Sequence, residues 1–261
     1  MNTIYSCPEH YAQDIIKSFK LTPPIDLDKI LGCLDIKVNY ESLGNIEALL
    51  IVSKGKKNII LNEVENRNIN RDRFTIAHEI GHYILPLHKN LQFDDAIDFN
   101  CDDKVECEAN DFASELLIPE EHLLKDIKNE KLTINLIKRL AEKYNVSLVV
   151  MVRRILKYSD TEAIALIYYS SGKKYIQMKS PSFRGELKEG RIKNSSAHKL
   201  INNYRSSAET KEILDYDVWF KDSDEEYNVI EESIYQSRLG RVFTLLRRAD
   251  LEDELSLTWD F

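Results

Sequence analysis

The alternation of apolar and polar positions divides the first part of the chain into helices and short strands. Residues 9–20 carry an amphipathic pattern that predicts a helix, and a second short helix is expected from Ile25 to Leu31. The period then changes to that of strands. Three strands are expected at 36–40, 47–52 and 58–62, and the last two are joined by a turn at Lys54-Gly55-Lys56.

Two longer helices are expected next along the chain. The segment from Arg73 to Leu85 has an apolar stripe at helical spacing, and Pro86 ends the helix. The stripe consists of Phe74, Ala77, Gly81, Ile84 and Leu85. After an acidic connection, interpreted as solvated, a second helix is expected from about Lys104 to Ile118, capped by an aspartate before it and followed by Pro119.

The rest of the chain is expected to hold a helical segment and then a region of mixed character. Three helical pieces fill residues 121–157. Strands are expected at 163–169 and 174–178, a helix near 196–205, and further strand-like pieces near 216–220, 227–230 and 242–246. We therefore predict an α+β fold with two domains, residues 1–158 and 159–261. The first domain is expected to hold a three-stranded, mainly antiparallel sheet beside the helix at 73–85.

Composition and charge narrow the class of protein. Apolar residues make up 43% and charged residues 31%, which is typical of a globular protein with a sizeable core. The net charge is −8 and both halves are acidic, which argues against nucleic acid as the main ligand. The N-terminus lacks a signal-peptide pattern, and no apolar stretch is long enough to cross a membrane. The four cysteines form no CxxC pair, which indicates free thiols, so we expect a cytoplasmic protein.

The sequence His78-Glu79-Ile80-Gly81-His82 lies in the first of the two longer helices. At about 100° per residue the two histidines lie about 40° apart on one helix face, so both imidazoles can reach one ion. Glu79 lies beside them and can act on a water without being a ligand. Catalytic zinc uses three protein ligands and an open position. The motif therefore predicts a zinc site with Glu79 as the general base.

The residues leave two candidates for the third ligand. His88 lies six residues after His82, the separation used by metzincins, but the glycine that such a motif needs is missing. Glu106 shares a helix face with Asn110, an amide that can support a ligand. We favour Glu106, and we interpret Glu108, on the other side of that helix, as a solvated charge.

Two segments carry a family resemblance. RFTIAHEIGHYIL at 73–85 is followed by ECEANDFASELLIP at 106–119. Together they resemble the ImmA/IrrE family of metallo-endopeptidases, which pairs an RFTLAHELGH-like helix with an ExxANxFAxxLLxP helix. The resemblance covers roughly residues 22–157, and it departs from the family only by isoleucine for leucine at 76, 80 and 118. It implies a zincin-like domain in which His78, His82 and Glu106 hold zinc and Glu79 is the catalytic base.

The resemblance also implies a substrate. Proteases of this family cleave helix-turn-helix repressors of the Xre type, so we predict a zinc endopeptidase whose partner is such a repressor. An extended substrate segment could pair with the exposed edge of the hairpin at 47–62. The alternatives are a repressor-binding protein that does not cleave, which the intact Glu79 disfavours, and a DNA-binding regulator. The domain at 159–261 is expected to be regulatory or to select substrates.

A DNA-binding regulator would use residues 133–157, part of the helix-turn-helix-like segment 121–157. Its second helix carries Arg153, Arg154 and Lys157. Three cations in an acidic chain are weak support for binding to phosphates, so a helical packing segment is the favoured interpretation.

A pair of cysteines and a set of three basic residues each allow a functional and a non-functional interpretation. Cys101 and Cys107 flank the start of the Glu106 helix and could respond to oxidants, although idle thiols are favoured. Arg184, Arg191 and Lys193 could bind an anion, although a solvated surface is favoured.

Overall fold

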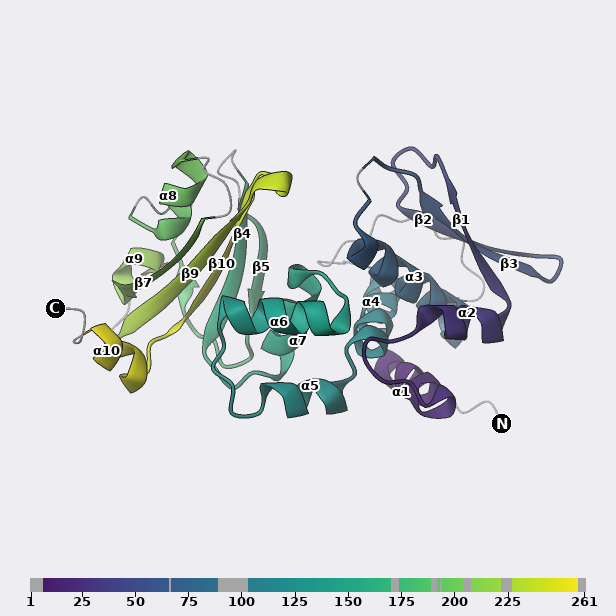
Figure 1. Cartoon of the computed structure of the whole chain (residues 1–261), viewed down its shortest axis with the longest axis horizontal. Helices are drawn as coiled ribbons and strands as arrows, with labels where there is room; N and C mark the ends of the chain where they lie inside the picture. Colours follow the sequence, from purple (N-terminus) through teal and green to yellow (C-terminus); the bar gives the residue numbers. More distant parts are fainter. Residues whose placement is uncertain are drawn as a thin grey trace. The chain divides into compact units, whose positions relative to one another are not determined.

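The computed structural model describes residues 7–65, 67–88, 103–169, 174–188, 192, 194–203, 208–221 and 227–257. The chain divides into two compact units, whose helices and strands are labelled in Figure 1. The N-terminal unit comprises Met1–Lys128 and Arg139–Met151. The C-terminal unit comprises Asn129–Lys138 and Val152–Phe261.

The N-terminal unit contains a three-stranded sheet in the order β1-β3-β2. β2 (Ala48–Ser53) and β3 (Lys56–Asn62) form the predicted hairpin, and β1 (Ile36–Glu41) lies beside β3. The prediction of a mainly antiparallel sheet is wrong, because β1 pairs with β3 in parallel. The side chain of Asn62 fixes the connection from β1 to β2, since it accepts from the Leu43 N–H at 2.9 Å and donates to the Gly44 carbonyl at 2.9 Å.

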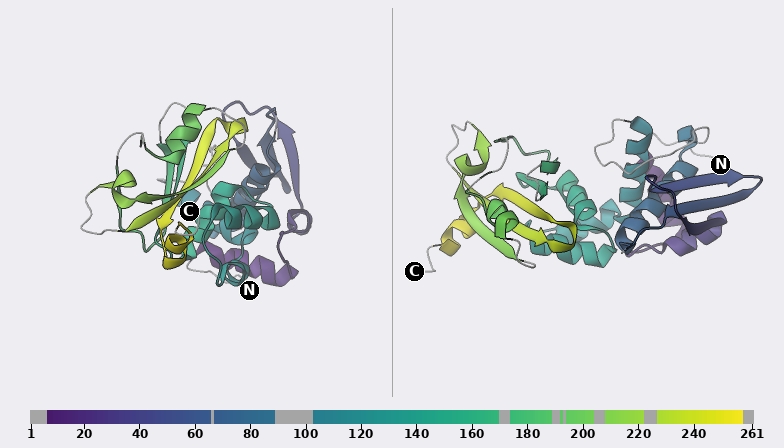
Figure 2. Two further views of the ribbon diagram at one scale, coloured as in Figure 1. Left: turned by 60° about the vertical axis from the view of Figure 1, so that its left-hand side comes forward. Right: turned by 90° about the horizontal axis from the view of Figure 1, so that it is seen from above.

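Helices pack against this sheet and against one another. The N-terminal helices are α1 (Pro8–Phe19), α2 (Leu27–Leu34), α3 (Ile69–Ile84), α4 (Lys104–Leu117) and α5 (Glu120–Ile127), with a 3₁₀ turn at Pro86–His88. α3 packs on β2, β3 and α4, and α1 packs chiefly on α4 (Figure 1). Figure 2 shows the same elements from two further sides. Both longer helices therefore have one face buried inside a single unit.

Two helices include residues from both units. α6 (Ile134–Tyr144) and α7 (Leu148–Tyr158) match the predicted helices at 133–143 and 147–157 closely. The division assigns residues 129–138 and 152–158 to the C-terminal unit. The boundary near Ser159 stays a prediction about independently folding domains.

The C-terminal unit is built on a five-stranded antiparallel sheet in the order β5-β4-β10-β9-β7. Its strands are β4 (Ala163–Tyr169), β5 (Lys174–Lys179), β7 (Glu209–Asp215), β9 (Asn228–Gln236) and β10 (Arg241–Arg248). A small sheet pairs β6 (Glu186–Leu187) with β8 (Phe220–Lys221), and the helices are α8 (Ser196–Asn203), α9 (Tyr216–Trp219) and α10 (Leu251–Leu257), with a 3₁₀ turn at Ser237–Leu239.

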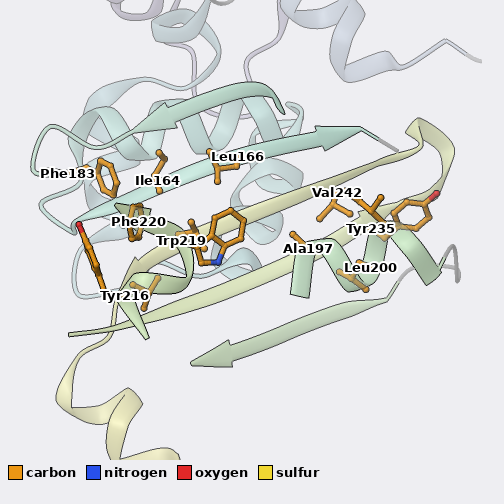
Figure 3. Close-up of a cluster of buried hydrophobic side chains, with 13 residues drawn as sticks. Ile164, Leu166, Phe183, Ala197, Leu200, Tyr216, Trp219, Phe220, Tyr235 and Val242 are labelled. Carbon is orange, nitrogen blue, oxygen red and sulfur yellow. The ribbon is translucent and has the colours of Figure 1, made fainter. Parts of the chain in front are cut away.

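The core of this unit lies between the sheet and the helices α8 and α9, as Figure 3 shows. Trp219 and Leu200 from the helices meet Leu166 and Val242 from the strands there. The segment 216–220 was predicted as a strand, but most of it forms the single turn α9. Tyr216 and Trp219 lie three residues apart and both are buried, which a helical turn achieves and a strand does not.

Candidate metal centre

The helix α3 holds both histidines of the HExxH motif on its buried face. Asn68 caps the helix, because its side chain accepts from the N–H groups of Asn70 and Arg71. The histidines are four positions apart, so their rings lie on one face of the helix in an edge-to-face arrangement, and the two Nε2 atoms lie 2.9 Å apart. Both imidazoles are buried. The predicted convergence of His78 and His82 is therefore present in the structure.

The helix α4 brings Glu106 to the same point. Its Oε2 lies 3.1 Å from His78 Nε2 and its Oε1 lies 3.2 Å from His82 Nε2. Gly81 permits this approach, since a Cβ at that position would lie 3.0 Å from the ring of Phe112 on α4. A larger residue at 81 would require the buried ring of Phe112 to shift by a few tenths of an ångström.

A set of polar side chains behind the histidines fixes their orientation. Asn110 Oδ1 lies 3.0 Å from His78 Nδ1. His88 Nδ1 lies 2.9 Å from His82 Nδ1, and His88 Nε2 lies 3.1 Å from Glu108 Oε2. A carboxylate only accepts, so neutral His88 donates to Glu108 from Nε2 and accepts from His82 at Nδ1. Both ligand candidates then carry their proton on Nδ1 and turn the Nε2 lone pair toward Glu106.

These contacts correct two expectations. Asn110 was expected to support Glu106, but it contacts His78. Glu108 was interpreted as a solvated charge, but it contacts the buried His88. A helix projection of α4 could not reveal the second contact, since it depends on the 3₁₀ turn Pro86–His88 that folds His88 back behind His82. The separation of six residues was the signal in the sequence, although it pointed to His88 as a ligand.

The converging atoms need a cation. Two imidazole lone pairs and a carboxylate meet within about the length of a hydrogen bond, in a site with little access to water, and none of these atoms has a proton to offer the others. Among the described residues, His78, His82 and Glu106 form the group of potential ligands whose donor atoms lie within 4.8 Å of one another. Two nitrogens and one carboxylate suit a metal ion with an open coordination position.

The protonation states of these side chains also favour binding of a metal ion. Burial lowers the pKa of His82, and the nearby carboxylate of Glu106 only partly opposes it. Burial raises the pKa of Glu106, but when the imidazoles turn N–H groups toward it, hydrogen bonds from His78 and His82 outweigh burial and hold that pKa below its usual range. A neutral imidazole and an ionised carboxylate are the forms that bind metal.

Comparison with known proteins supports this chemistry. The model of a peptidase family described as the IrrE N-terminal-like domain matches residues 31–156. Metallopeptidase ImmA of Bacillus subtilis (strain 168) is 32% identical over 129 residues, which cover 47% of this chain and 71% of that protein. The chain belongs to the ImmA/IrrE family of metallopeptidases. An uncharacterized immunity region protein 2 of Bacillus phage phi105 is 30% identical over 131 residues, covering 50% of this chain and 80% of that protein.

A solved structure shares the fold over nearly the whole chain. It is a Mycobacterium tuberculosis transcriptional regulator with a TM-score of 0.58 and 10% identity, and the match covers 99% of this chain and 82% of that one. At this level of identity the likeness concerns architecture alone. The likeness in architecture includes the C-terminal unit, which lies largely outside the family match at 31–156.

Glu79 lies next to the cluster in this metallopeptidase. It follows His78 on α3 and is only 5% exposed. A carboxylate that is not one of the three converging groups, but follows one of them directly in the helix, has the position expected of a general base. Its role as the catalytic base stays a prediction.

Two observations bear on the environment of the protein. Cys107 is in a disulfide bond, whereas Cys7 and Cys33 are free thiols, so the expectation of free thiols is wrong for Cys107. Cys101 lies outside the described residues. The helices in the described part of the chain are each too short or too polar to cross a lipid bilayer.

Proposed function

We propose that this chain is a zinc-dependent endopeptidase that cleaves a helix-turn-helix transcriptional repressor of the Xre type. The observation that carries the proposal is the convergence of His78, His82 and Glu106 on one buried point. Two histidines and one glutamate are a ligand set that catalytic zinc uses in peptidases. The metallopeptidase and the phage immunity region protein among the relatives support proteolysis and a substrate connected with immunity.

Each residue of the centre has a separate task in the proposed reaction. His78, His82 and Glu106 would hold the zinc, which when bound supplies a Lewis acid for the scissile carbonyl and acidifies water. Glu79 accepts the proton of the attacking water and passes it to the leaving amine. Asn110 and His88 hold the two imidazoles in the required tautomers through their Nδ1 atoms.

The strand β2 offers a route for the substrate. It is an edge strand, since it pairs with β3 on one side only in the three-stranded sheet. Val52 on this strand is 57% exposed, and Ile51 is partly exposed as well. Glu47, just before β2, receives hydrogen bonds from Arg71 and Thr75 of α3, which tie the edge to the motif helix. An extended segment of the repressor would add to this edge through main-chain hydrogen bonds.

The test compares Glu79→Gln with the wild-type protein in cleavage of a purified Xre-type repressor. The amide cannot accept the proton of water, so cleavage should fall by about 10²–10⁴-fold while zinc content and thermal unfolding stay unchanged. Glu63→Gln, the same change at an exposed position outside the cluster, should cleave normally. Chelation should abolish cleavage and added zinc should restore it.

Three other outcomes would count against the proposal. Activity of Glu79→Gln above about a tenth of wild type would remove Glu79 from the base role. Tight binding of the repressor by the zinc-loaded protein without any cleavage would favour the non-catalytic alternative. Salt-dependent binding to operator DNA without cleavage would favour the regulator, although Arg154 on α7 is buried against Tyr158. The repressor partner requires the cytoplasm, and the cytoplasmic location stays a prediction.

A further inference from the structure

A pocket of about 470 Å³ lies within the C-terminal unit. One wall is the last part of α7, and the other is the end of β5 with the turn that follows it. Four basic side chains line it, from Arg153, Lys157, Lys179 and Arg184. None of the ten described residues that line it is acidic.

This charge distribution departs from the composition of the chain. Acidic residues outnumber basic residues by 44 to 36, so an average surface of this protein has an acidic surplus. Four basic side chains in a lining without an acidic residue favour an anion in this pocket by charge. The cations come from two parts of the sequence more than twenty residues apart, so the tertiary structure brings them together.

The wall that carries Arg184 is fixed by hydrogen bonds. Ser180 donates its N–H to the Ala163 carbonyl at 2.9 Å, and its hydroxyl accepts from the Ala163 N–H at 3.1 Å. The Phe183 N–H donates to the Ser180 carbonyl at 3.1 Å, and Arg184 Nη1 donates to the Pro181 carbonyl at 2.7 Å. A wall with this many internal bonds is formed before a ligand arrives, which lowers the entropy cost of binding.

Apolar side chains line the same pocket between the cations. Pro181 is exposed there, whereas Leu156, Met178 and Phe183 contribute small areas, because each is at most 7% exposed. Phe183 also packs on Phe220, with ring centroids 5.5 Å apart, so this part of the pocket is continuous with the core drawn in Figure 3. A fully hydrated inorganic ion would leave this apolar surface uncovered. The lining suits a molecule with both a charged group and an apolar body.

We propose that this pocket binds a small phosphate ester that carries an apolar body. The phosphate would lie between the lysines and arginines, which recognise it by charge and by hydrogen bonds. The apolar body would lie on Pro181 and on the methylene stems of Lys157 and Lys179, next to the edge of Phe183. The site lies within the C-terminal unit and does not depend on the proposed peptidase activity.

The experiment titrates the full-length protein with 1-naphthyl phosphate in a calorimeter, with inorganic phosphate and 1-naphthol as the two half-ligands. We expect one naphthyl phosphate per chain, at least tenfold weaker binding of each half-ligand, and weaker binding at high salt. The variant with both Lys157→Gln and Lys179→Gln should bind at least tenfold more weakly. Both lysines are exposed, so the variant should fold normally.

A matched control is available in the same unit. Lys199→Gln removes an exposed lysine of α8 that pairs with Glu212 and does not line the pocket, so it should bind as the wild type does. Absence of naphthyl phosphate binding, or equal binding by the double variant, would overturn the proposal. Binding of duplex DNA that the double variant loses, without binding of naphthyl phosphate, would reassign these cations to nucleic acid.

Discussion

Both units of the chain bury glutamates, and the surroundings of Glu106 and Glu231 are opposite. Glu106 in the N-terminal unit meets two imidazole nitrogens whose protons are committed elsewhere. Glu231 in the C-terminal unit is surrounded by donors. It accepts from the Ala197 N–H at 2.7 Å, from Trp219 Nε1 at 2.9 Å and from the Ser233 hydroxyl at 3.0 Å.

The difference shows what makes a buried acid a functional group. Burial raises the pKa of Glu231, and the hydrogen bonds from Ala197, Trp219 and Ser233 partly oppose that rise. The protein itself therefore satisfies the hydrogen-bonding capacity of this carboxyl group. It joins α8 and α9 to the sheet. Glu106 lacks such donors, and only a cation can satisfy the three groups together. Burial alone therefore identifies neither a site nor a structural role, whereas the supply of donors distinguishes them.

The largest expected effect comes from replacing Glu106 by glutamine and comparing the result with the same substitution at Glu231. Glu106→Gln should weaken zinc binding by more than about 100-fold, since removal of a charged ligand exceeds the loss of about 10- to 100-fold from a supporting group. It should also abolish the stabilisation that added zinc gives to the wild type. Zinc content after dialysis and thermal unfolding with added zinc measure both effects.

Glu231→Gln is the control for that prediction. It should keep zinc affinity and instead lower the free energy of unfolding by about 1–3 kcal/mol. The reason is that the NH₂ group of glutamine would face a hydrogen-bond donor where the carboxylate oxygen now accepts a hydrogen bond. Full zinc retention in Glu106→Ala together with loss of zinc in His88→Ala would replace Glu106 by His88 as the third ligand.

A third buried acid tests the comparison through stability alone. Asp253 on α10 forms a paired contact with Arg247 of β10, at 2.5 Å and 3.0 Å, and both side chains are buried. Asp253→Asn leaves the arginine charge without its counter-ion, so the free energy of unfolding should fall by about 3–5 kcal/mol. Denaturant unfolding followed by fluorescence measures it. Glu186→Gln, which breaks the exposed pair with Lys221, should change it by less than about 1 kcal/mol.

Asp253 also makes the free energy of unfolding depend on pH. Burial raises the pKa of Asp253, but hydrogen bonds from Arg247 and Lys131 outweigh burial and hold it below its usual value. As the pH falls, Asp253 is therefore protonated in the unfolded chain before it is protonated in the folded protein. The stabilisation is complete above the ordinary aspartate pKa of about 3.9 and is lost as the pH falls below it. An acid dependence of unfolding equal in Asp253→Asn and wild type would contradict this assignment.

The smallest expected effect concerns the group behind the zinc ligands. His88→Ala removes the acceptor that fixes the tautomer of His82, so zinc affinity should fall by about 10- to 100-fold at constant pH. His88→Asn, whose amide oxygen can accept the same proton, should recover part of the loss. His198→Ala in the C-terminal unit should leave the affinity unchanged. Complete loss of zinc in His88→Asn would indicate a ligand instead of a positioning residue.

Local pattern predicted most elements of the N-terminal unit closely. The helices that carry His78 and Glu106, and the hairpin of β2 and β3, are within a few residues of their predicted bounds. Apolar periodicity, caps and prolines act over one or two turns, so a single sequence contains them. The C-terminal unit was predicted less well. β7 was missed, and Tyr216–Trp219 was taken for a strand, because burial against a distant sheet decided those segments.

The sequence by itself determined the donor types of the metal centre and the family, because HExxH and the second motif are local patterns on helices. Only the tertiary structure decided that β1 runs parallel to β3, that Glu108 and His88 stand behind His82, and that cations of α7 and β5 share a pocket. Those arrangements join residues that are distant along the chain or lie on different elements. Their energies depend on packing between elements, which no periodicity within one element encodes.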